Sequence, residues 1–363
     1  MNYREVEILG PTDLGASGTK IIDLDIQDLL STIELTWRTK VATVSDMTAT
    51  HASCISKIEL VDGSEILWSL SGEQAQALGW YGHGLPPLND ITVVQNDYMT
   101  SVIPIYFGRF PLDPDLAFDP KRFINPQLKI TWDEDAANAS VVVNELTVRA
   151  WAFDQKAISP RGFLMAKEIK AFTPVASAYE YTDLPTDYPY RLIMLRSAST
   201  DKNPFEVLDE FKLSEDHDKR VPFDLTGYEI FRKFVWPLGP NAQKVRLNET
   251  AGDAMALYLA PTYLQSGQVD YDADVVAADD DYSQVAYAGN KVTIAATVNY
   301  VPYLLSLEGY APHFCMAIPL GRLDDIGDWF DPRVLGNVRL TTKGASAVGT
   351  SPAAQIVIQQ LRA

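Results

Sequence analysis

The feature that most constrains this chain is an internal repeat, which links the end of its first half to its C-terminus. Each copy holds an Ile-Pro pair, a Gly-Arg pair and a Phe-Asp-Pro triplet in the same order. The aspartate and the next asparagine are six residues apart in both copies, at Asp119 and Asn125 and at Asp331 and Asn337. Motifs that share order and spacing indicate a duplicated domain. The other matched residues are Ile103, Pro104, Gly108, Arg109, Phe118 and Pro120, and Ile318, Pro319, Gly321, Arg322, Phe330 and Pro332.

The early parts of the two copies also correspond. Each contains a Leu-Ser-Gly or Leu-Thr-Gly triplet, and an aspartate and an arginine 13 residues apart. The copies are offset by 158 residues early and by 212 late, so the second carries about 54 extra residues. We expect a first domain at 1–165, and a second at 166–363 with an inserted acidic loop at about 250–305. The matched residues are Asp25, Arg38, Leu70, Ser71 and Gly72, and Asp183, Arg196, Leu225, Thr226 and Gly227.

The composition of the chain favours an all-β fold. The 363 residues are 47% hydrophobic and 21% charged, which is typical of a folded protein with room for two domains. Short runs rich in Val, Ile, Thr, Tyr and Phe alternate with turn residues. Helical stretches are expected at 72–78 and at 115–123, where Asp119 and Pro120 form a helix-start pair. The first half holds seven or eight expected strands, among them 20–26, 32–38, 55–61, 65–70, 101–107, 127–132 and 141–152.

Eight strands per copy with long connections predict two tandem eight-stranded antiparallel jelly rolls, with short helices in the connections. An immunoglobulin-type sandwich is the rival architecture, but it needs only about 100 residues and its Cys and Trp pattern is absent. The residues before the first expected strand, about 18 in number, are predicted to be an N-terminal extension.

Charge and cysteine content exclude several classes of protein. Cys54 and Cys315 show no metal-binding spacing, and the N-terminus does not have the basic and then apolar pattern of a signal peptide. No stretch of 18 apolar residues is present. A net charge of -18 argues against direct binding of nucleic acid over a broad surface, because phosphate contacts need clustered Lys and Arg.

The duplicated segments VIPIYFGRFPLDPDLAFDPKRFINPQLKITW and MAIPLGRLDDIGDWFDPRVLGNVRL resemble the double-jelly-roll major capsid proteins of tailless icosahedral viruses, the architecture of the adenovirus hexon. The resemblance covers nearly the whole chain. It implies a bacteriophage-like structural protein that forms homotrimers, in which six jelly rolls make a pseudo-hexameric capsomer of the virion. It also implies synthesis in the host cytoplasm, and neighbouring capsomers, penton and minor capsid proteins and an internal membrane as partners.

Aromatic loops are the candidate subunit contacts. Trp80 and Tyr81 lie in one such loop and Trp236 in another, and large aromatic side chains are enriched at interfaces. Capping of the barrel ends is an equally good interpretation of these residues. Arg109 and Arg322, at matching positions of the two copies, are each expected to pair with a carboxylate at a strand end.

The sequence offers little chemistry beyond this. Within the acidic insertion, Asp270, Asp272 and Asp274 are a weak candidate Ca²⁺ site, and a solvated acidic loop explains them better. No nucleophile elbow, phosphate-binding loop or paired metal-binding histidines occur, so we expect no enzyme activity and no cofactor.

Two alternative functions remain at this level. One is a two-jelly-roll glycan-active enzyme, an amidase or glycosidase, with carboxylates in a groove between the rolls. The other is a tandem carbohydrate-binding module that uses Trp80, Trp151, Trp236 and Trp329. Both alternatives predict a monomer or dimer, whereas a shell subunit must be an obligate oligomer.

Overall fold

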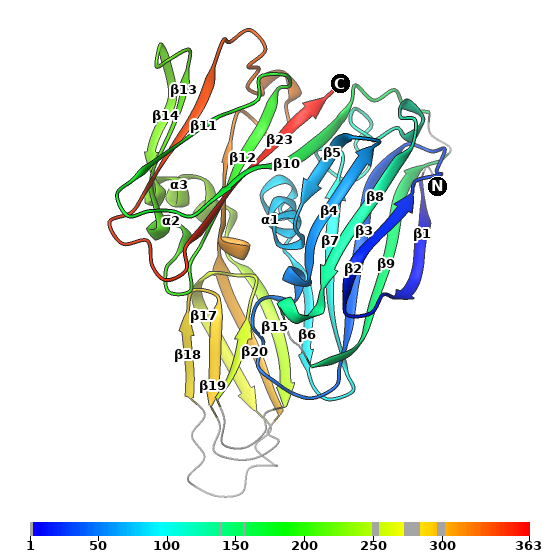
Figure 1. The fold of residues 1–363 in the computed structure, drawn as a ribbon, viewed down its shortest axis with the longest axis vertical. Helices are drawn as coiled ribbons and strands as arrows, with labels where there is room; N and C mark the ends of the chain where they lie inside the picture. The colour runs from blue at the N-terminus through cyan, green and yellow to red at the C-terminus, as the bar shows by residue number, and fades with distance from the viewer. Residues whose placement is uncertain (1–2, 138–139, 155–156, 249–253, 272–283, 296–301) are drawn as a thin grey trace, which may run out of the picture.

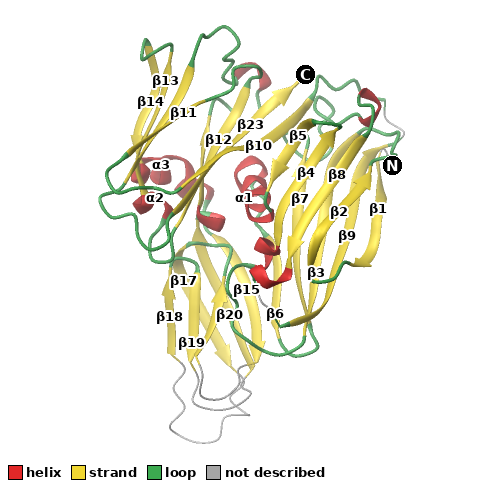
Figure 2. Ribbon diagram, viewed as in Figure 1, coloured by secondary structure: helices red, strands yellow, loops and turns green. Residues whose placement is uncertain are grey.

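The computed structural model describes residues 3–137, 140–154, 157–248, 254–271, 284–295 and 302–363. Figure 1 shows two groups of nearly upright strands side by side, with a narrower group of strands, β15 to β20, below them. Figure 2 shows that the helices lie mainly at the sides of the strand groups, and that α1 lies between the two groups.

The first group is a jelly roll of two four-stranded antiparallel sheets. One sheet has the order β1-β9-β3-β7 and the other the order β2-β8-β4-β5. The strands are β1 (Tyr3–Asp13), β2 (Ser17–Asp23), β3 (Leu30–Val41), β4 (Ile55–Asp62), β5 (Glu65–Leu70), β7 (Tyr98–Tyr106), β8 (Pro126–Asp133) and β9 (Val141–Phe153). A further strand, β6 (Leu88–Val93), pairs with the free edge of β7.

The second group repeats this order. Its sheets are β10-β23-β12-β21 and β11-β22-β13-β14. The strands are β10 (Phe163–Phe172), β11 (Tyr179–Asp183), β12 (Tyr190–Ala198), β13 (Leu208–Glu215), β14 (Arg220–Thr226), β21 (Cys315–Pro319), β22 (Val338–Gly344) and β23 (Ala353–Arg362). The prediction of two tandem eight-stranded jelly rolls is therefore confirmed.

The N-terminal segment differs from its expected structure. We expected an extension before the first strand, but β1 pairs along its length with β9. Val6 and Ile8 are half-buried against the core, whereas Glu5 and Glu7 between them are exposed. This alternation has the period of a strand with one buried face.

The insertion of the second roll is also more ordered than expected. In place of a simple loop, its described residues form β15 (Asn241–Asn248), β16 (Ala254–Tyr258), β17 (Tyr263–Tyr271), β18 (Gln284–Ala288), β19 (Lys291–Ala295) and β20 (Pro302–Tyr310). Buried Val292 and Ile294 in β19 follow the alternation of a strand with one buried face, whereas Met255, Ala256 and Leu257 of β16 are all buried. Of the three aspartates proposed as Ca²⁺ ligands, Asp272 and Asp274 lie outside the described residues.

Two helices follow equivalent strands in the two rolls. α1 (Gly72–His83) follows β5, and α3 (Gly227–Ile230) follows β14 and continues as the turns η4 (Phe231–Val235) and η5 (Trp236–Leu238). The predicted short helix near Asp119 is η2 (Pro120–Arg122), with the Asp119 carboxylate accepting from the backbone of Lys121. The remaining helical elements are α2 (Pro204–Val207), η1 (His51–Cys54), η3 (Glu134–Ala136), η6 (Pro312–Phe314) and η7 (Ile326–Asp328).

The two rolls share sheets and a core. β6 pairs in parallel with β15, and β5 pairs in parallel with β10 through Ser69 and Lys167. One hydrophobic cluster runs through both rolls and includes Trp37 of the first and Phe211 of the second. The expected division between residues 165 and 166 falls inside β10, so we propose to place it at Phe163, where that strand begins.

Candidate functional site: the junction of the two rolls

α1 is the central element of the junction. Its start is fixed by a capping box, in which Ser71 accepts from the backbone of Gln74 and the Gln74 side chain accepts from the backbone of Ser71. It ends at Gly84, whose φ of 69° is the left-handed conformation of a helix C-cap. α1 therefore lies between β5, the last strand of one sheet of the first roll, and the second roll.

The expectation that Trp80 and Tyr81 contact other subunits is wrong. Their side chains are only 7% and 4% exposed within the single chain. The Tyr81 hydroxyl donates a 2.6 Å hydrogen bond to the backbone oxygen of Cys315 in β21, so it joins the first roll to the second. These aromatic side chains do form an interface, but it lies inside the chain.

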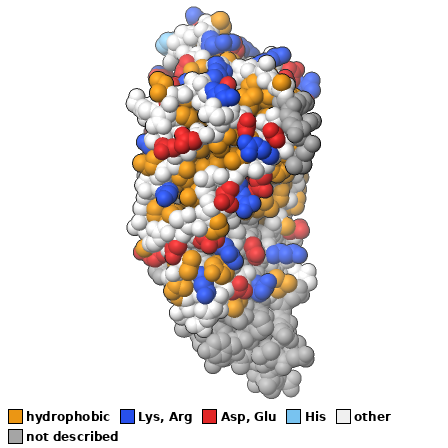
Figure 3. All heavy atoms as spheres, turned by 90° about the vertical axis from the view of Figure 1, so that its right-hand side faces the viewer, with side chains coloured by type: hydrophobic (Ala, Val, Ile, Leu, Met, Phe, Trp, Pro, Cys, Tyr) orange, Lys and Arg blue, Asp and Glu red, His pale blue; other side chains and the backbone are white. Residues whose placement is uncertain are grey.

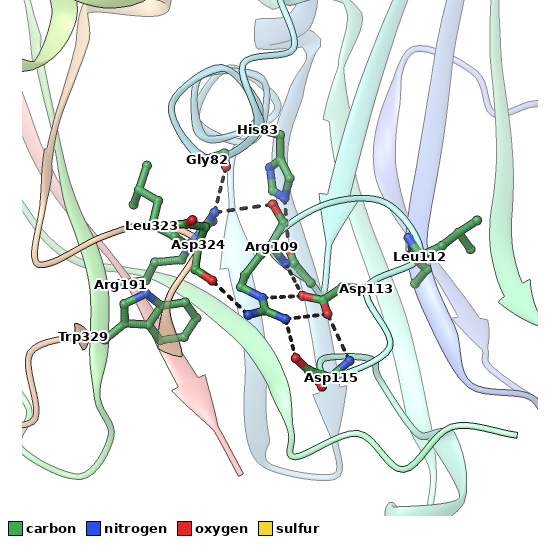
Figure 4. Close-up of polar contacts among 12 residues, drawn as sticks. Gly82, His83, Arg109, Leu112, Asp113, Asp115, Arg191, Leu323, Asp324 and Trp329 are labelled. Carbon is green, nitrogen blue, oxygen red and sulfur yellow. Dashed lines mark hydrogen bonds and ion pairs between the residues drawn. The ribbon is translucent and has the colours of Figure 1, made fainter. Parts of the chain in front are cut away.

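A buried arginine is the second component of the junction (Figure 4). Arg191 is 1% exposed and donates to the backbone oxygen of Gly82 at 2.8 Å, to the side chain of Gln359 at 3.0 Å and to the backbone oxygen of Leu323 at 3.1 Å. Burial, together with the nearby charge of Arg109, lowers the pKa of Arg191 to about 10. The side chain still carries its charge at neutral pH, and acceptors from both rolls surround it.

The two repeated arginines pair with carboxylates as expected. Arg109 binds Asp113 at 2.7 Å and Asp115 at 2.6 Å, and donates to the backbone oxygen of Asp324 in the second roll at 2.9 Å. Burial would raise the pKa of Asp113, but hydrogen bonds from Arg109 and from the backbone lower it. Arg322 pairs with Asp324 at 3.2 Å in a more exposed position. Arg109 therefore connects the rolls, whereas Arg322 supports its own loop.

A third polar group surrounds Glu73 at the start of α1. Its carboxylate binds Arg196 of β12 at 2.6 Å and accepts from the Thr50 hydroxyl at 2.6 Å. Burial disfavours the charged form of Glu73, but Arg196, the neighbouring His313 ring and the hydrogen bond from Thr50 prevail and lower its pKa to about 2. His313 is fully buried and shares a 2.8 Å hydrogen bond with Gln76 of α1.

These buried groups hold the rolls together and are poorly suited to catalysis. Burial raises the pKa of Cys54 and of Cys315 to about 12, so both remain protonated thiols. Burial lowers the pKa of His51 to about 3, and hydrogen bonds to Thr39 and Ser101 occupy both of its ring nitrogens.

No group of three or more His, Cys, Asp or Glu side chains suited to a metal ion occurs within the described ranges. Asp270 lies in β17, and the other two candidate Ca²⁺ ligands are not described, so the Ca²⁺ site stays a prediction. In the described part of the chain, no helix is long and apolar enough to cross a membrane.

The tryptophans proposed for carbohydrate binding do not share a surface. Trp80 and Trp329 are buried, at 7% and 5% exposure, whereas Trp151 and Trp236 are exposed and belong to different rolls. Trp151 stacks on Tyr3 at the β1 edge of the first roll, the side of the molecule that Figure 3 presents. Apolar side chains on that side lie among Lys, Arg, Asp and Glu.

One open hollow of about 510 Å³ lies on the outer face of the sheet β11-β22-β13-β14. Tyr179, Tyr181, Glu210, Lys212 and Arg339 are among the side chains that line it. Each charged side chain of this group already has a partner, since Lys212 binds Asp218, Arg339 binds Asp183 and Glu210 binds Lys343.

The order of the strands defines the class of the fold, which is a double jelly roll. No family model matches the sequence, and no curated protein matches it significantly. Solved structures do match. The chain is similar to the STIV MCP, with a TM-score of 0.58, 8% identity, and coverage of 99% of this chain and 96% of that one.

Two further capsid structures are similar over nearly the whole chain. The PBCV-1 virus capsid matches with a TM-score of 0.56 and 10% identity, covering 99% of this chain and 92% of that one. The major capsid protein P2 from bacteriophage PM2 matches with a TM-score of 0.51 and 10% identity, covering 99% and 98%. At these identities the likeness establishes a shared fold.

Proposed function

We propose that this chain is the major capsid protein of an icosahedral virus, a structural protein without enzyme activity. The observation that carries the proposal is the fusion of two jelly rolls, equal in strand order, into one block with continuous sheets and a shared core. Such a block presents flat sides, and its sheets leave only short free edges. The similarity to capsid structures extends over 99% of the chain, which supports the same role.

Three copies of such a block would supply six rolls, and closed threefold symmetry would determine how their sides meet. The proposed assembly is thus a homotrimeric, pseudo-hexameric capsomer of the virion, made in the host cytoplasm. Its proposed partners are neighbouring capsomers, penton and minor capsid proteins, and an internal membrane; a bacteriophage is the proposed source. The net charge of -18 supports a shell that leaves genome contact to another component.

The mass of the purified protein in dilute solution tests this function. Light scattering should give a particle of three times 40.3 kDa that persists on dilution, and electron microscopy of larger species should show closed shells tiled by hexagonal blocks. A stable monomer would contradict the proposal and favour the enzyme or carbohydrate-binding alternatives.

A further inference from the structure

The helices that come after β5 and β14 occupy equivalent places in the two rolls. Thr226 and Glu229 form the same capping box as Ser71 and Gln74. A side chain on Gly72 would place its Cβ 2.4 Å from the backbone oxygen of Ala52, and one on Gly227 would come equally close to that of Leu208. Both segments close on a glycine with positive φ, Gly84 and Gly239. All these pairs lie 155 residues apart, so Tyr81 corresponds to Trp236 and Glu73 to Tyr228.

An irregularity in strand pairing that both rolls share shows which residues of their sheets correspond. The pairing of β3 with β9 shifts register between Leu30 and Thr32, and the pairing of β12 with β23 shifts between Tyr190 and Leu192. Leu30 forms an isolated bridge to Phe118, and Tyr190 forms one to Phe330. β3 and β12 therefore correspond at an offset of 160 residues. In this register Glu34, Thr36, Val102 and Pro104 correspond to Met194, Arg196, Cys315 and Ala317.

The corresponding sheet faces differ in burial. In the second roll, α1 covers the face of β12 and β21, where Met194, Cys315 and Ala317 are no more than 2% exposed. In the first roll Glu34 is exposed, and Val102 and Pro104 are half-buried. A small hollow of about 90 Å³ lies on this face, lined by these three side chains with Tyr106 and by residues 85–88.

The segment equivalent to α1 has the side chains to cover such a face. Tyr228, Trp236 and Leu238 are 59%, 47% and 42% exposed. Arg232 and Lys233 beside them are exposed, and neither is in an ion pair with a described residue. The face of the first roll carries the carboxylates of Glu5, Glu7 and Glu34, of which only the first two pair with Arg149. The exposed apolar side chains and basic residues of the segment thus match Val102, Pro104 and Glu34 of this face, which also carries Arg38, Lys40 and Arg149.

We propose that α3, η4 and η5 of one copy dock on the outward face of β3 and β7 of a second copy, in the way that α1 covers β12 and β21 within the chain. This contact rests on the proposed function and names the surfaces that it uses. It joins different surfaces of the two copies, so it is heterologous and closes into a ring only at a suitable rotation. By the equivalences above, Trp236 of one copy lies near Val102 of the next, and Tyr228 lies near Thr36.

Trp236→Ala tests the apolar part of this contact. Removing a central interfacial tryptophan should weaken association at least about 30-fold, measured by light scattering on serial dilution. Tyr181→Ala is the matched control, because Tyr181 is 58% exposed on the distant β11 and should leave association unchanged. Equal behaviour of both variants would overturn the proposed contact.

Chemical cross-linking tests the register independently of stability. Within the chain Glu73 and Arg196 touch, so cysteines at the equivalent positions, Tyr228→Cys with Thr36→Cys, should be joined between copies by a short bis-maleimide. The control pair is Tyr181→Cys with Thr36→Cys, and the native Cys54 and Cys315 are buried. Covalent dimers and trimers from the first pair alone support the contact.

These experiments distinguish a failure of the proposed contact from a failure of the proposed function. An intact oligomer that the Tyr228→Cys and Thr36→Cys pair does not cross-link would overturn this contact and leave the proposed function standing. A wild-type protein that is monomeric in dilute solution would overturn both.

Discussion

α1 and the segment formed by α3, η4 and η5 begin alike and end in different surroundings. Both start with a capping box and a tightly packed glycine, and both end at a glycine with positive φ. Trp80 and Tyr81 of α1 are nevertheless buried, and Tyr81 bonds to the second roll, whereas the equivalent Trp236 is 47% exposed. The repeat thus specifies the same helix start in both rolls. Only in the first roll do the residues that follow contact the other roll of the same chain. The exposed copy is the surface that we propose to bind a second copy of the chain.

The rolls also differ in the strands that come after these helices. The first roll passes from α1 through β6 to β7, whereas the second passes through β15 and then inserts β16 to β20 before β21. β6 and β15 occupy the same place after the helix and pair with each other in parallel. The extra strands therefore extend a position that already exists in the first roll, and the eight-stranded frame is unchanged.

Removing Arg191 should produce the largest effect, because it takes a buried charge and three hydrogen bonds out of the junction of the rolls. Arg191→Ala leaves the backbone oxygens of Gly82 and Leu323 and the side chain of Gln359 without a buried donor. We expect a loss of about 3 to 5 kcal/mol in the free energy of unfolding, measured in urea at fixed protein concentration. Arg322→Ala, at an exposed arginine, should cost less than about 0.5 kcal/mol. Similar losses in both variants would contradict the importance of the junction.

Acid should weaken the same junction through Glu73. Its folded pKa of about 2 lies below the value of about 4.5 in the unfolded chain, so its contribution is complete above pH 4.5 and is lost as the pH falls towards 2. Glu73→Gln should cost about 3 kcal/mol at pH 7 and reduce the pH dependence of unfolding below 4.5. Tyr228→Gln at the equivalent position should leave both unchanged in the dissociated chain. An unaltered pH profile in Glu73→Gln would count against the ion pair.

The glycines that begin the two helices test whether the copies are locally equivalent. Gly72→Ala and Gly227→Ala each place a Cβ 2.4 Å from a backbone oxygen, so each should cost about 2 kcal/mol in thermal or urea unfolding. Gly327→Ala is the control, since its nearest contact is an ordinary 3.4 Å. A large difference between the first two variants would show that the helices begin differently.

The capping residues should give the smallest effects. Ser71→Ala and Thr226→Ala each remove a hydrogen bond to the third helical residue, which typically costs about 1 kcal/mol. Only Thr226→Ala should also weaken association, because only its helix is proposed to contact a second copy. Calorimetry and light scattering on the two variants separate these effects.

Much of the fold could be predicted from the repeat. The late alignment is confirmed from the Phe-Asp-Pro triplet onward, since Leu128 pairs with Leu60 and Leu340 with Leu213 at matching places of the two rolls. Its Ile-Pro pair is displaced by two residues, because Pro104 corresponds to Ala317 and not to Pro319. The early alignment is wrong by two residues, because Asp23, and not Asp25, corresponds to Asp183. A shift of two residues preserves the alternation of buried and exposed side chains, so hydrophobic pattern alone could not reveal the error.

The junction could be predicted only in part. Arg109 stands out in the sequence because it recurs as Arg322, and the capping motifs recur as well. Arg191 does not recur, and its one signal is an arginine within the apolar run Tyr190 to Leu195, a place where a charge must find buried partners. Trp80 and Tyr81 lie in the part of α1 that extends beyond the predicted helix, and the Tyr81 hydroxyl bonds to Cys315, which is 234 positions away and could not be paired with it from the sequence.

The most direct test is a three-dimensional reconstruction of the assembled protein by electron cryomicroscopy. We predict a pseudo-hexagonal block in which α3, η4 and η5 cover β3 and β7 of the next copy, with Trp236 against Val102, as α1 covers β12 and β21 within each chain. An assembly in which that face of β3 and β7 meets solvent or a different element would contradict the proposed contact.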